Sequence, residues 1–329
     1  MNPKVSILVP VFKASAYIEK CAESIFNQTF EDIQYIFVND ATPDDSMEKL
    51  NLVIHRFPAR KNQIMIIHNS ENKGSGFTKN LALDSASGDY IAFVDSDDYI
   101  DADMIEILYL KAINENADIV VSDIFMEYIN RKEIINEYVA ETKGEQFADM
   151  IRNDRLHSFL CDKLVTRNLY LHPECRIPEG LNYLEDRHVM TRLFYFAEKI
   201  VKVNRAFYHY IQYNENAITK KKDRMHFENV KLFWNLMDQF MKQKNEFEKF
   251  KSVLAVSKVK NKVRLMIDTH SKVLRKEFAN LFHNEETNCL SHFKKGEKLM
   301  LILIRYRFFE LAQLFHNILL IKNRKVLIK

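Results

Sequence analysis

The sequence is poor in the residues that build disulfide frameworks or interrupt secondary structure. Its 329 residues include only four cysteines, six prolines and six glycines. No two cysteines form a CxxC pair, and four scattered cysteines in a chain of this length favour a reducing, cytoplasmic compartment. We expect all four to be small buried side chains. They are Cys21, Cys161, Cys175 and Cys289.

The sequence also lacks a long uncharged apolar run. The most apolar late stretch, residues 299–321, is interrupted by Arg305, Arg307 and Glu310. A membrane-spanning helix needs roughly 20 apolar residues with few charges, so no transmembrane helix is expected. The first residues do not combine a basic segment with a long apolar stretch, so no signal peptide is expected either.

Charge of one sign is not in large excess, because the formal net charge is only +3. This value gives no reason to expect nucleic-acid binding. The charge is unevenly distributed, however. Residues 251–329 carry 17 Lys and Arg against 6 Asp and Glu, and the rest of the chain carries 31 against 39. The acidic and the basic part are therefore expected to have different partners.

The pattern of residues 1–122 alternates short β-branched runs with helical periodicity, which predicts an α/β fold with a mainly parallel sheet covered on both faces. Residues 123–225 are less regular, with helices expected at 154–165 and 184–197. From about residue 226 the spacing is helical throughout. We therefore predict two domains, residues 1–225 and a basic helical region at 226–329. Within the first domain, strands are expected at 5–9, 35–38, 64–67, 90–94, 118–122, 200–203 and 206–211.

Three acidic residues directly follow the apolar segment Tyr90–Val94. Asp95 and Asp97 are two positions apart, so in extended backbone they project to the same side. Carboxylates held this close repel each other unless a proton or a cation lies between them. Mg²⁺ and Mn²⁺ prefer such oxygen ligands, so a divalent metal site is one interpretation. The alternative is an acidic turn that caps the next helix through Asp98 or Asp101.

A second acid, Asp40, also follows an apolar segment. Ligands of open α/β sheets bind beyond the carboxyl ends of strands, so Asp40 and Asp95 are expected in one crevice. Between them, the segment Asn72–Asn80 contains Gly74 and opens a predicted helix. Backbone N–H groups at such a helix start favour an anion, and Lys79 could assist.

In this order, the motifs resemble the family 2 glycosyltransferases. The resemblance covers about residues 3–220, and residues 226–329 resemble no family that we can name. The matching segments are Val5–Phe12, Tyr17–Ile18, Val38–Thr42, Asn72–Gly74, Lys79–Asn80, Gly88–Asp98, Asp162–Leu164, Ile177–Gly180, Tyr183–Asp186 and Tyr208–Tyr210.

This resemblance implies a GT-A, Rossmann-like fold with a nucleotide-sugar half at about 1–122 and an acceptor half at about 123–225. It implies an inverting hexosyl- or N-acetylhexosaminyltransferase that uses a nucleotide diphosphate donor, expected to be a UDP-sugar, with Mn²⁺ or Mg²⁺. The acceptor would be a saccharide or a lipid-linked saccharide. The related enzymes synthesise bacterial capsule, lipopolysaccharide or exopolysaccharide at the cytoplasmic face of the membrane.

The resemblance also implies roles for nucleotide-binding residues. Asp40 would bind the uracil base, and Pro10 and Phe12 would line its pocket. The segment Asp95–Asp97 would be the DxD motif, in which Asp97 contacts the metal and Asp95 the ribose or the metal, with Ser96 between them. Gly74 and Lys79 complete the expected nucleotide-binding set.

The acceptor half supplies the expected catalytic residues. Asp186 of the pair Glu185-Asp186 would be the general base. His209 would give a further metal or phosphate contact, and Lys163 would contact a substrate.

Four residues depart from the pattern of the family. Phe12 stands where Tyr is common, Asn39 and Ala41 where Asp and Gly are common, and Lys79 where Arg is common. At position 79, a planar guanidinium that can form two parallel hydrogen bonds is thus replaced by the compact ammonium group of lysine.

Two other functions remain open from sequence. A nucleotidyltransferase would need a glycine-rich phosphate loop after the first strand, where this chain has Pro10–Ala14 without glycine. A scaffold that binds sugar nucleotides without turnover would not need the acids at 95, 97 and 186. The basic region 226–329 has two interpretations, either peripheral contact with a membrane surface or a helical bundle packed on the catalytic domain or on a second copy in a homo-oligomer.

Overall fold

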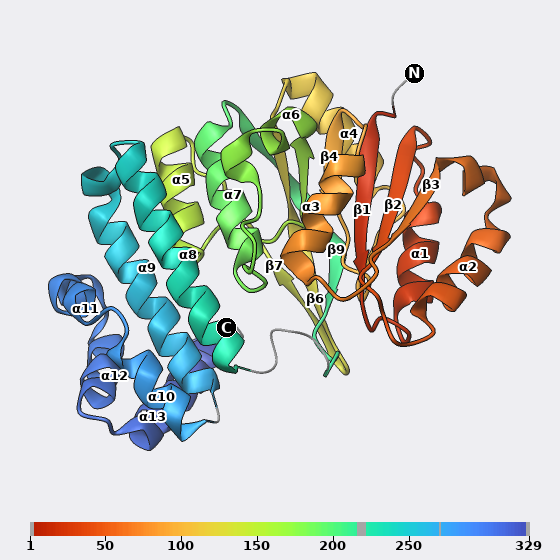
Figure 1. Cartoon of the computed structure of the whole chain (residues 1–329). Helices are drawn as coiled ribbons and strands as arrows, with labels where there is room; N and C mark the ends of the chain where they lie inside the picture. Colours follow the sequence, from red (N-terminus) through yellow and green to blue (C-terminus); the bar gives the residue numbers. More distant parts are fainter. Residues whose placement is uncertain (1–2, 216–221, 270, 327–329) are drawn as a thin grey trace. The chain divides into compact units, whose positions relative to one another are not determined.

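The computed structural model describes residues 3–215, 222–269 and 271–326, which form two compact units that divide between residues 216 and 217. The N-terminal unit is a mixed α/β structure built on one large sheet (Figure 1). The C-terminal unit contains helices and no strand among its described residues.

The sheet of the N-terminal unit has the strand order β3-β2-β1-β4-β8-β6-β9-β5, and β7 pairs with β6. Strands β3, β2, β1 and β4 run parallel to one another, whereas β8 is antiparallel to both β4 and β6. Strand β1 pairs with β2 on one side and with β4 on the other. The sheet therefore grows in one direction from β1 to β3 and in the opposite direction from β4 onward. The strands are β1 (Val5–Val11), β2 (Ile33–Asn39), β3 (Ile64–His68), β4 (Tyr90–Phe93), β5 (Tyr99–Ile100), β6 (Ile119–Tyr128), β7 (Arg131–Ile135), β8 (Lys163–Thr166) and β9 (Ile200–Ile211).

Helices cover both faces of this sheet because its strands are apolar on both sides. Val5, Ile7 and Val9 of β1 join a buried cluster with residues of α1, α2 and α4. Leu8, between them in sequence, is also fully buried but faces the other way. On that second face α3 contacts β1 and β2. The helices of this unit are α1 (Ile18–Phe26), α2 (Ser46–Arg56), η1 (Pro58–Gln63), α3 (Ser75–Ser85), α4 (Met104–Glu115), α5 (Lys143–Arg152), α6 (Arg167–Tyr170), η2 (Pro173–Cys175) and α7 (Glu185–Phe196).

The structure confirms the predicted α/β class, and two local predictions are wrong. Residues 154–165 were expected to be a helix, but residues 154–162 are irregular and residues 163–165 belong to β8. The strands expected at 200–203 and 206–211 are one strand, β9, whose pairing with β6 shifts register near Asp123. Such a bulge lets a long strand bend without ending.

The C-terminal unit is all-helical in its described residues, as the periodicity predicted. Its two longest helices are neighbours, and Trp234 of one donates a hydrogen bond to Asn261 of the other (Nε1 to Oδ1, 3.2 Å). The helices are α8 (Arg224–Gln243), α9 (Phe247–Asp268), α10 (Lys272–Asn280), α11 (His283–Cys289), η3 (Leu290–His292), α12 (Lys295–Arg305) and α13 (Phe309–Val326).

Within the described ranges, no helix has the length and the apolar character needed to cross a bilayer. All four cysteines are buried and carry free thiols.

Candidate active site

The carboxyl ends of β1, β2 and β4 lie side by side. The N–H of Asp40, just after β2, donates to the carbonyl of Val11 at the end of β1 (3.0 Å). The N–H of Val94, just after β4, donates to the carbonyl of Leu8 in β1 (3.0 Å). The two predicted acidic strand ends therefore flank β1, where the strand order changes direction, and such a point is a common ligand site in open α/β sheets.

Asp40 holds the loop that precedes α3. Its Oδ1 accepts hydrogen bonds from the side-chain amide of Asn69 and the backbone N–H of Lys73 (both 2.8 Å), and its Oδ2 accepts one from the N–H of Gly74 (2.9 Å). The side chain is almost fully buried. Three of the roughly four acceptor positions of a carboxylate are thus used within the protein.

Pro10 and Phe12 lie at the same edge of the sheet. Pro10 stands opposite Val38 in the β1–β2 register. Phe12 follows β1 and leaves 40 % of its surface exposed, which makes its ring available for stacking. Ala41, where the family commonly has Gly, adopts φ +51. This left-handed conformation explains why glycine suits that position.

Of the three acids that follow β4, Asp98 is committed to the scaffold. Its two oxygens accept hydrogen bonds from the hydroxyl of Tyr208 and the N–H of Ile211, both at 2.7 Å. The same Tyr208 hydroxyl accepts a hydrogen bond from the N–H of Asp95 (3.0 Å). Strand β9 therefore fixes the backbone that carries the acids. Asp95 and Asp97 are less buried than Asp98, and Ser96 between them is buried.

Asp97 has one protein partner that the sequence analysis missed. Asn214 donates from Nδ2 to Oδ2 of Asp97 (2.7 Å). Asn214 also lines a cleft of about 640 Å³, formed by residues 13–17 after β1, residues 43–49 after β2 and residues 213–215 after β9. This volume is within the range of small-molecule sites. The cleft therefore reaches the acidic cluster from the carboxyl ends of β1 and β2.

The local field disfavours negative charge at all three acids. Burial raises the pKa of Asp95 to about 6, with repulsion from Asp97 and Glu185 added and attraction to Lys79 opposing it. Burial also raises the pKa of Asp97. For Asp98, burial and the two neighbouring carboxylates raise the pKa well above its usual value. A cation or a proton is needed to stabilise such a group of charges.

The acids Glu185 and Asp186 are the first two residues of α7. Lys79 of α3 reaches both, at 3.0 Å from Glu185 Oε1 and 2.5 Å from Asp186 Oδ1. Glu185 also accepts a hydrogen bond from the hydroxyl of Ser75 (2.8 Å). Its side chain is 12 % exposed, whereas that of Asp186 is 32 % exposed. Asp186 is therefore the more accessible acid of the pair.

Electrostatics couple this pair to the acids after β4. Burial would lower the pKa of Lys79, but the charges of Asp186, Glu185 and Asp95 together raise it well above its usual value. Burial raises the pKa of Asp186 to about 7, against the opposing attraction of Lys79. Glu185 and Asp95 raise it further. An acid with a pKa near neutrality is well matched to proton transfer.

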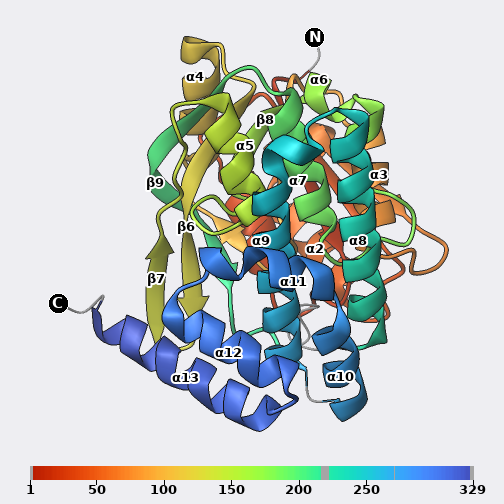
Figure 2. The ribbon, with the colours of Figure 1, turned by 90° about the vertical axis from the view of Figure 1, so that its left-hand side faces the viewer.

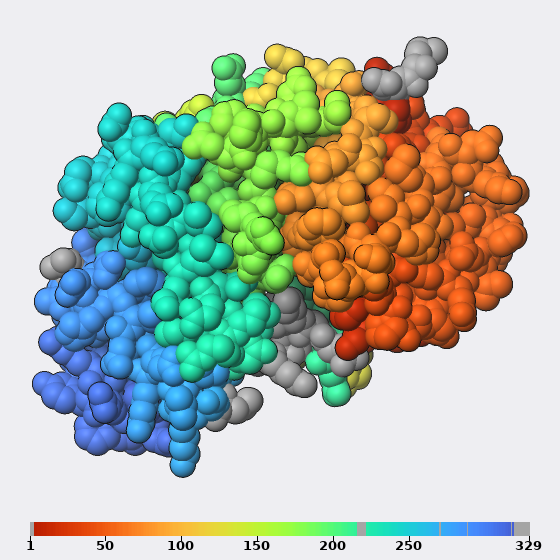
Figure 3. Space-filling model, in the orientation of Figure 1, coloured from red at the N-terminus to blue at the C-terminus, as the bar shows by residue number. Residues whose placement is uncertain are grey.

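Two glycines allow α3 and the segment before α7 to meet, side by side on the surface in Figure 3. Gly74 has φ +85, and a Cβ there would lie 2.4 Å from Oδ1 of Asn182. That oxygen accepts a hydrogen bond from the N–H of Gly76 (3.2 Å). Asn182 was not predicted, because nothing in the sequence distinguishes it from other loop asparagines.

Lys163 is not exposed to a substrate in this structure. It is fully buried, and its ammonium group donates to the carbonyls of His157 and Phe159 and to Asp162 Oδ1, at 2.7–3.0 Å. An ammonium group has three protons. All of them have protein partners, which indicates a structural role at the start of β8.

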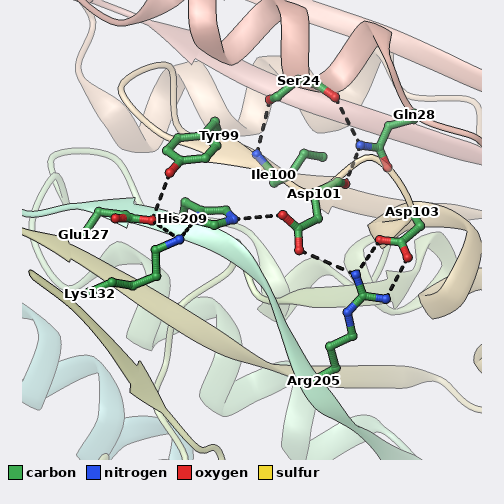
Figure 4. A network of polar contacts seen from close by, with 10 residues as sticks. All are labelled: Ser24, Gln28, Tyr99, Ile100, Asp101, Asp103, Glu127, Lys132, Arg205 and His209. Atoms are coloured by element: carbon green, nitrogen blue, oxygen red, sulfur yellow. Dashed lines mark hydrogen bonds and ion pairs between the residues drawn. The ribbon is translucent and has the colours of Figure 1, made fainter.

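The structure does not bring His209 to the Asp95–Asp97 pair. Its Nδ1 lies 2.6 Å from Glu127 Oε1, and its Nε2 lies 2.9 Å from Asp101 Oδ1 (Figure 4). Its ring is stacked on Tyr99 and on Phe125, with centroids at 4.2 and 4.6 Å. Both nitrogens are therefore used, and the contacts tie β5, which follows the acids, to β9 and β6.

Comparison with known proteins agrees with this architecture. Residues 6–168 match the model of the family described as glycosyl transferase family 2. Putative glycosyltransferase EpsH of Bacillus subtilis (strain 168) is 27 % identical over 259 residues, covering 77 % of this chain and 73 % of that protein. Glycosyltransferase GlyG of Streptococcus pneumoniae serotype 4 is 28 % identical over 221 residues, covering 64 % and 71 %.

Solved structures with the same fold include two with bound nucleotide sugars. S. aureus TarS 1-349 in complex with UDP-GlcNAc has a TM-score of 0.68 at 15 % identity, with 95 % of this chain and 90 % of that chain covered. Mannosyltransferase PcManGT from Pyrobaculum calidifontis, in complex with GDP-Man and Mn²⁺, has a TM-score of 0.52 at 13 % identity, with 95 % and 88 % covered.

Proposed function

We propose that this chain, which residues 6–168 identify as a member of glycosyl transferase family 2, transfers a sugar from a nucleotide diphosphate donor to an acceptor hydroxyl with inversion at the anomeric carbon. One observation carries this proposal. Lys79 joins the acids at the start of α7 to the helix that packs beside β1 and β2. A proton acceptor and the acids after β4 thus share one electrostatic environment.

The donor is proposed to bind beyond the carboxyl ends of β1, β2 and β4. The cleft at 13–17, 43–49 and 213–215 has room for a nucleotide, and Phe12, which precedes Lys13 of this cleft in the chain, offers an exposed ring for stacking. Asp40 supports this site mainly by holding the loop 69–74. A UDP-sugar is the donor we favour, in keeping with the UDP-GlcNAc bound by TarS.

The acids after β4 fit a divalent cation. Asp97 and Asp95 would hold Mn²⁺ or Mg²⁺, whereas Asp98 has both oxygens engaged by Tyr208 and Ile211. No three His, Cys, Asp or Glu side chains converge into a cage among the described residues. An ion of this kind needs only one or two carboxylates, because phosphate oxygens and water complete its coordination. When bound, it stabilises the charge of the leaving diphosphate.

Asp186 is the proposed general base. It is the more exposed acid of the pair and forms an ion pair with Lys79, whereas Glu185 is less exposed and also accepts a hydrogen bond from Ser75. Asp186 would accept the proton of the acceptor hydroxyl while the oxygen attacks the anomeric carbon and the diphosphate leaves. General-base assistance contributes typically about 10²–10⁴-fold to the rate. Lys79 orients the carboxylate and limits the rise of its pKa.

The acceptor is proposed to be a saccharide or a lipid-linked saccharide in the synthesis of a bacterial cell-surface polysaccharide, at the cytoplasmic face of the membrane. Support comes from bacterial glycosyltransferases among the relatives, including a poly(ribitol-phosphate) beta-glucosyltransferase of Bacillus spizizenii. We propose a hexosyl or N-acetylhexosaminyl group as the transferred sugar.

A thermal-shift screen of UDP-sugars and GDP-sugars with Mn²⁺ tests the proposal. A ligand present at about 100 times its Kd stabilises the fold by about 2.7 kcal/mol. We expect a UDP-sugar to raise the Tm with Mn²⁺ and to have a much smaller effect with EDTA. The Asp97→Asn variant should lose the metal-dependent part of the shift. If no sugar nucleotide shifts the Tm of the folded protein with Mn²⁺, the proposed function is wrong.

A further inference from the structure

The last two helices of the C-terminal unit each expose an apolar stripe. Figure 2 shows α12 and α13 side by side, and the two helices pack on each other. In α12, Met300, Leu301 and Ile304 are buried, whereas Leu299 and Ile302 are nearly half exposed. In α13, the exposed apolar residues are spaced by three and four positions, so they share one face of the helix. They are Leu311, Leu314 and Ile318, each at least 50 % exposed.

The connection between the two helices joins these stripes. It has the sequence Arg305-Tyr306-Arg307-Phe308, and all four residues are exposed. Tyr306 is 69 % and Phe308 54 % exposed. Large aromatic side chains flanked by arginines are suited to an interface that is apolar on one side and anionic on the other.

Charge distinguishes this surface from other exposed apolar residues of the chain. Residues 294–326 carry eight Lys and Arg against two Asp and Glu. Lys294 and Lys295 at the start of α12 are exposed, as are Arg305 and Arg307 at its end. The basic groups therefore lie at both ends of the apolar stripe of α12.

We propose that α12, α13 and the connection 305–308 dock on an anionic lipid surface, with the apolar stripes at the level of the acyl chains and the basic side chains at the head groups. Helices with one apolar and one basic face bind membranes in this way. Neither helix is long and apolar enough to cross the bilayer, so the docking is peripheral. A second copy of the chain is a poorer occupant, because it would bring two strongly basic surfaces together.

Flotation of the full-length protein with vesicles tests this surface without depending on the proposed transfer reaction. The probe is phosphatidylcholine vesicles with and without phosphatidylglycerol. We expect binding only to the anionic vesicles. It should weaken as the ionic strength rises from about 0.1 M to about 1 M, because the Debye length falls from about 10 Å to about 3 Å.

Two double variants separate the contribution of charge to vesicle binding from that of apolar contact. Arg305→Gln with Arg307→Gln should weaken binding about 25-fold, since each charge near an anionic surface contributes about fivefold. Tyr306→Ser with Phe308→Ser should weaken binding at least about tenfold, because two large apolar side chains no longer leave water. The matched control is Ile129→Ser, which removes a 79 % exposed side chain from the N-terminal unit and should bind as the wild type does.

Melting curves and donor binding establish that the variants are folded. The proposal is overturned if the folded wild-type protein does not bind anionic vesicles, if both double variants bind as tightly as the wild type, or if phosphatidylcholine alone binds equally well. It is also overturned if the wild-type protein dimerises without vesicles and Tyr306→Ser with Phe308→Ser abolishes the dimer, because a second copy then covers this surface. Vesicle binding that persists in Asp186→Asn is expected, since that variant changes no residue of α12, α13 or the connection 305–308.

Discussion

The ammonium group of Lys79 lies 2.5 Å from Oδ1 of Asp186, although the two residues are 107 positions apart in the chain. Lys79 is buried in α3, and Asp186 is the second residue of α7, with part of its side chain exposed. The ion pair therefore fixes the distance between the two halves of the site. It also keeps two neighbouring acids, Glu185 and Asp186, compatible with burial.

Replacing Lys79 by Met tests the structural part of this relationship. The pKa of Asp186 is already about 7 in the folded state, and without the opposing cation it rises further above its unfolded value. Stability of the variant is then best at low pH and is lost as the pH rises through the folded-state pKa of Asp186. We expect a loss of about 3 kcal/mol relative to the wild type at about pH 8, and a smaller loss at about pH 5. Urea unfolding at both pH values measures the difference.

Lys79→Arg is the matched control, because it keeps the positive charge and the family commonly has Arg here. It should unfold close to the wild-type midpoint at both pH values. Equal stability of Lys79→Met and Lys79→Arg at about pH 8 would show that the ion pair has no structural role.

The pH dependence of turnover follows from the raised pKa of Asp186. A general base must be ionised, so kcat/KM should fall tenfold per pH unit below a pKa of about 7. Initial rates with a saturating metal concentration measure this profile. A rate that stays constant down to about pH 5 would exclude Asp186 as a base with this pKa.

Gly74→Ala should damage the fold more than the same change at Gly180. Both glycines have positive φ, near +80, so alanine costs backbone strain at either position. Only at Gly74 would the new Cβ meet another side chain, since nothing lies within 4 Å at Gly180. Displacing Asn182 also breaks its hydrogen bond to Gly76. We expect Gly74→Ala to lose about 1–3 kcal/mol more stability by denaturant unfolding, and to lose donor affinity. Equal losses at the two positions would contradict the close packing of α3 on the segment before α7.

His209→Leu distinguishes a positioning role from metal ligation. The variant leaves Glu127 and Asp101 without the ring that joins them, so the unfolding free energy should fall by about 1–3 kcal/mol. Its affinity for Mn²⁺ in the presence of donor should remain close to that of the wild type, because His209 contacts Asp101 rather than Asp97. Asp97→Asn serves as the control that does lose Mn²⁺ affinity. If His209→Leu loses as much Mn²⁺ affinity as Asp97→Asn, the histidine is a ligand after all.

Much of the fold could be predicted because buried parallel strands leave a simple pattern. The run Tyr90–Val94 has one apolar residue after another, since both of its faces are covered. The prediction of a helix at 154–165 was wrong for a related reason. Its apolar residues pack irregularly around the buried ion pair of Asp162 and Lys163, and periodicity does not distinguish that arrangement from a helix.

Side-chain partners were harder to predict than strand ends. The acids at 40, 95 and 97 follow apolar runs, so their positions could be read directly. Asn214 and Asn182 contact residues more than a hundred positions away, and asparagine is common in every loop. Lys163 and His209 matched motifs of the family, but their donors and ring nitrogens are taken up inside the protein. A motif gives the position of a residue and does not give its partner.

The most direct test of the account is turnover of donor and acceptor by Asp186→Asn, measured together with donor affinity by calorimetry in the presence of Mn²⁺. Asparagine keeps the shape of the side chain and removes the proton acceptor. We expect a loss of about 10²–10⁴-fold in kcat with an unchanged Kd for the UDP-sugar. Full activity of this variant would contradict the role of Asp186 as the general base.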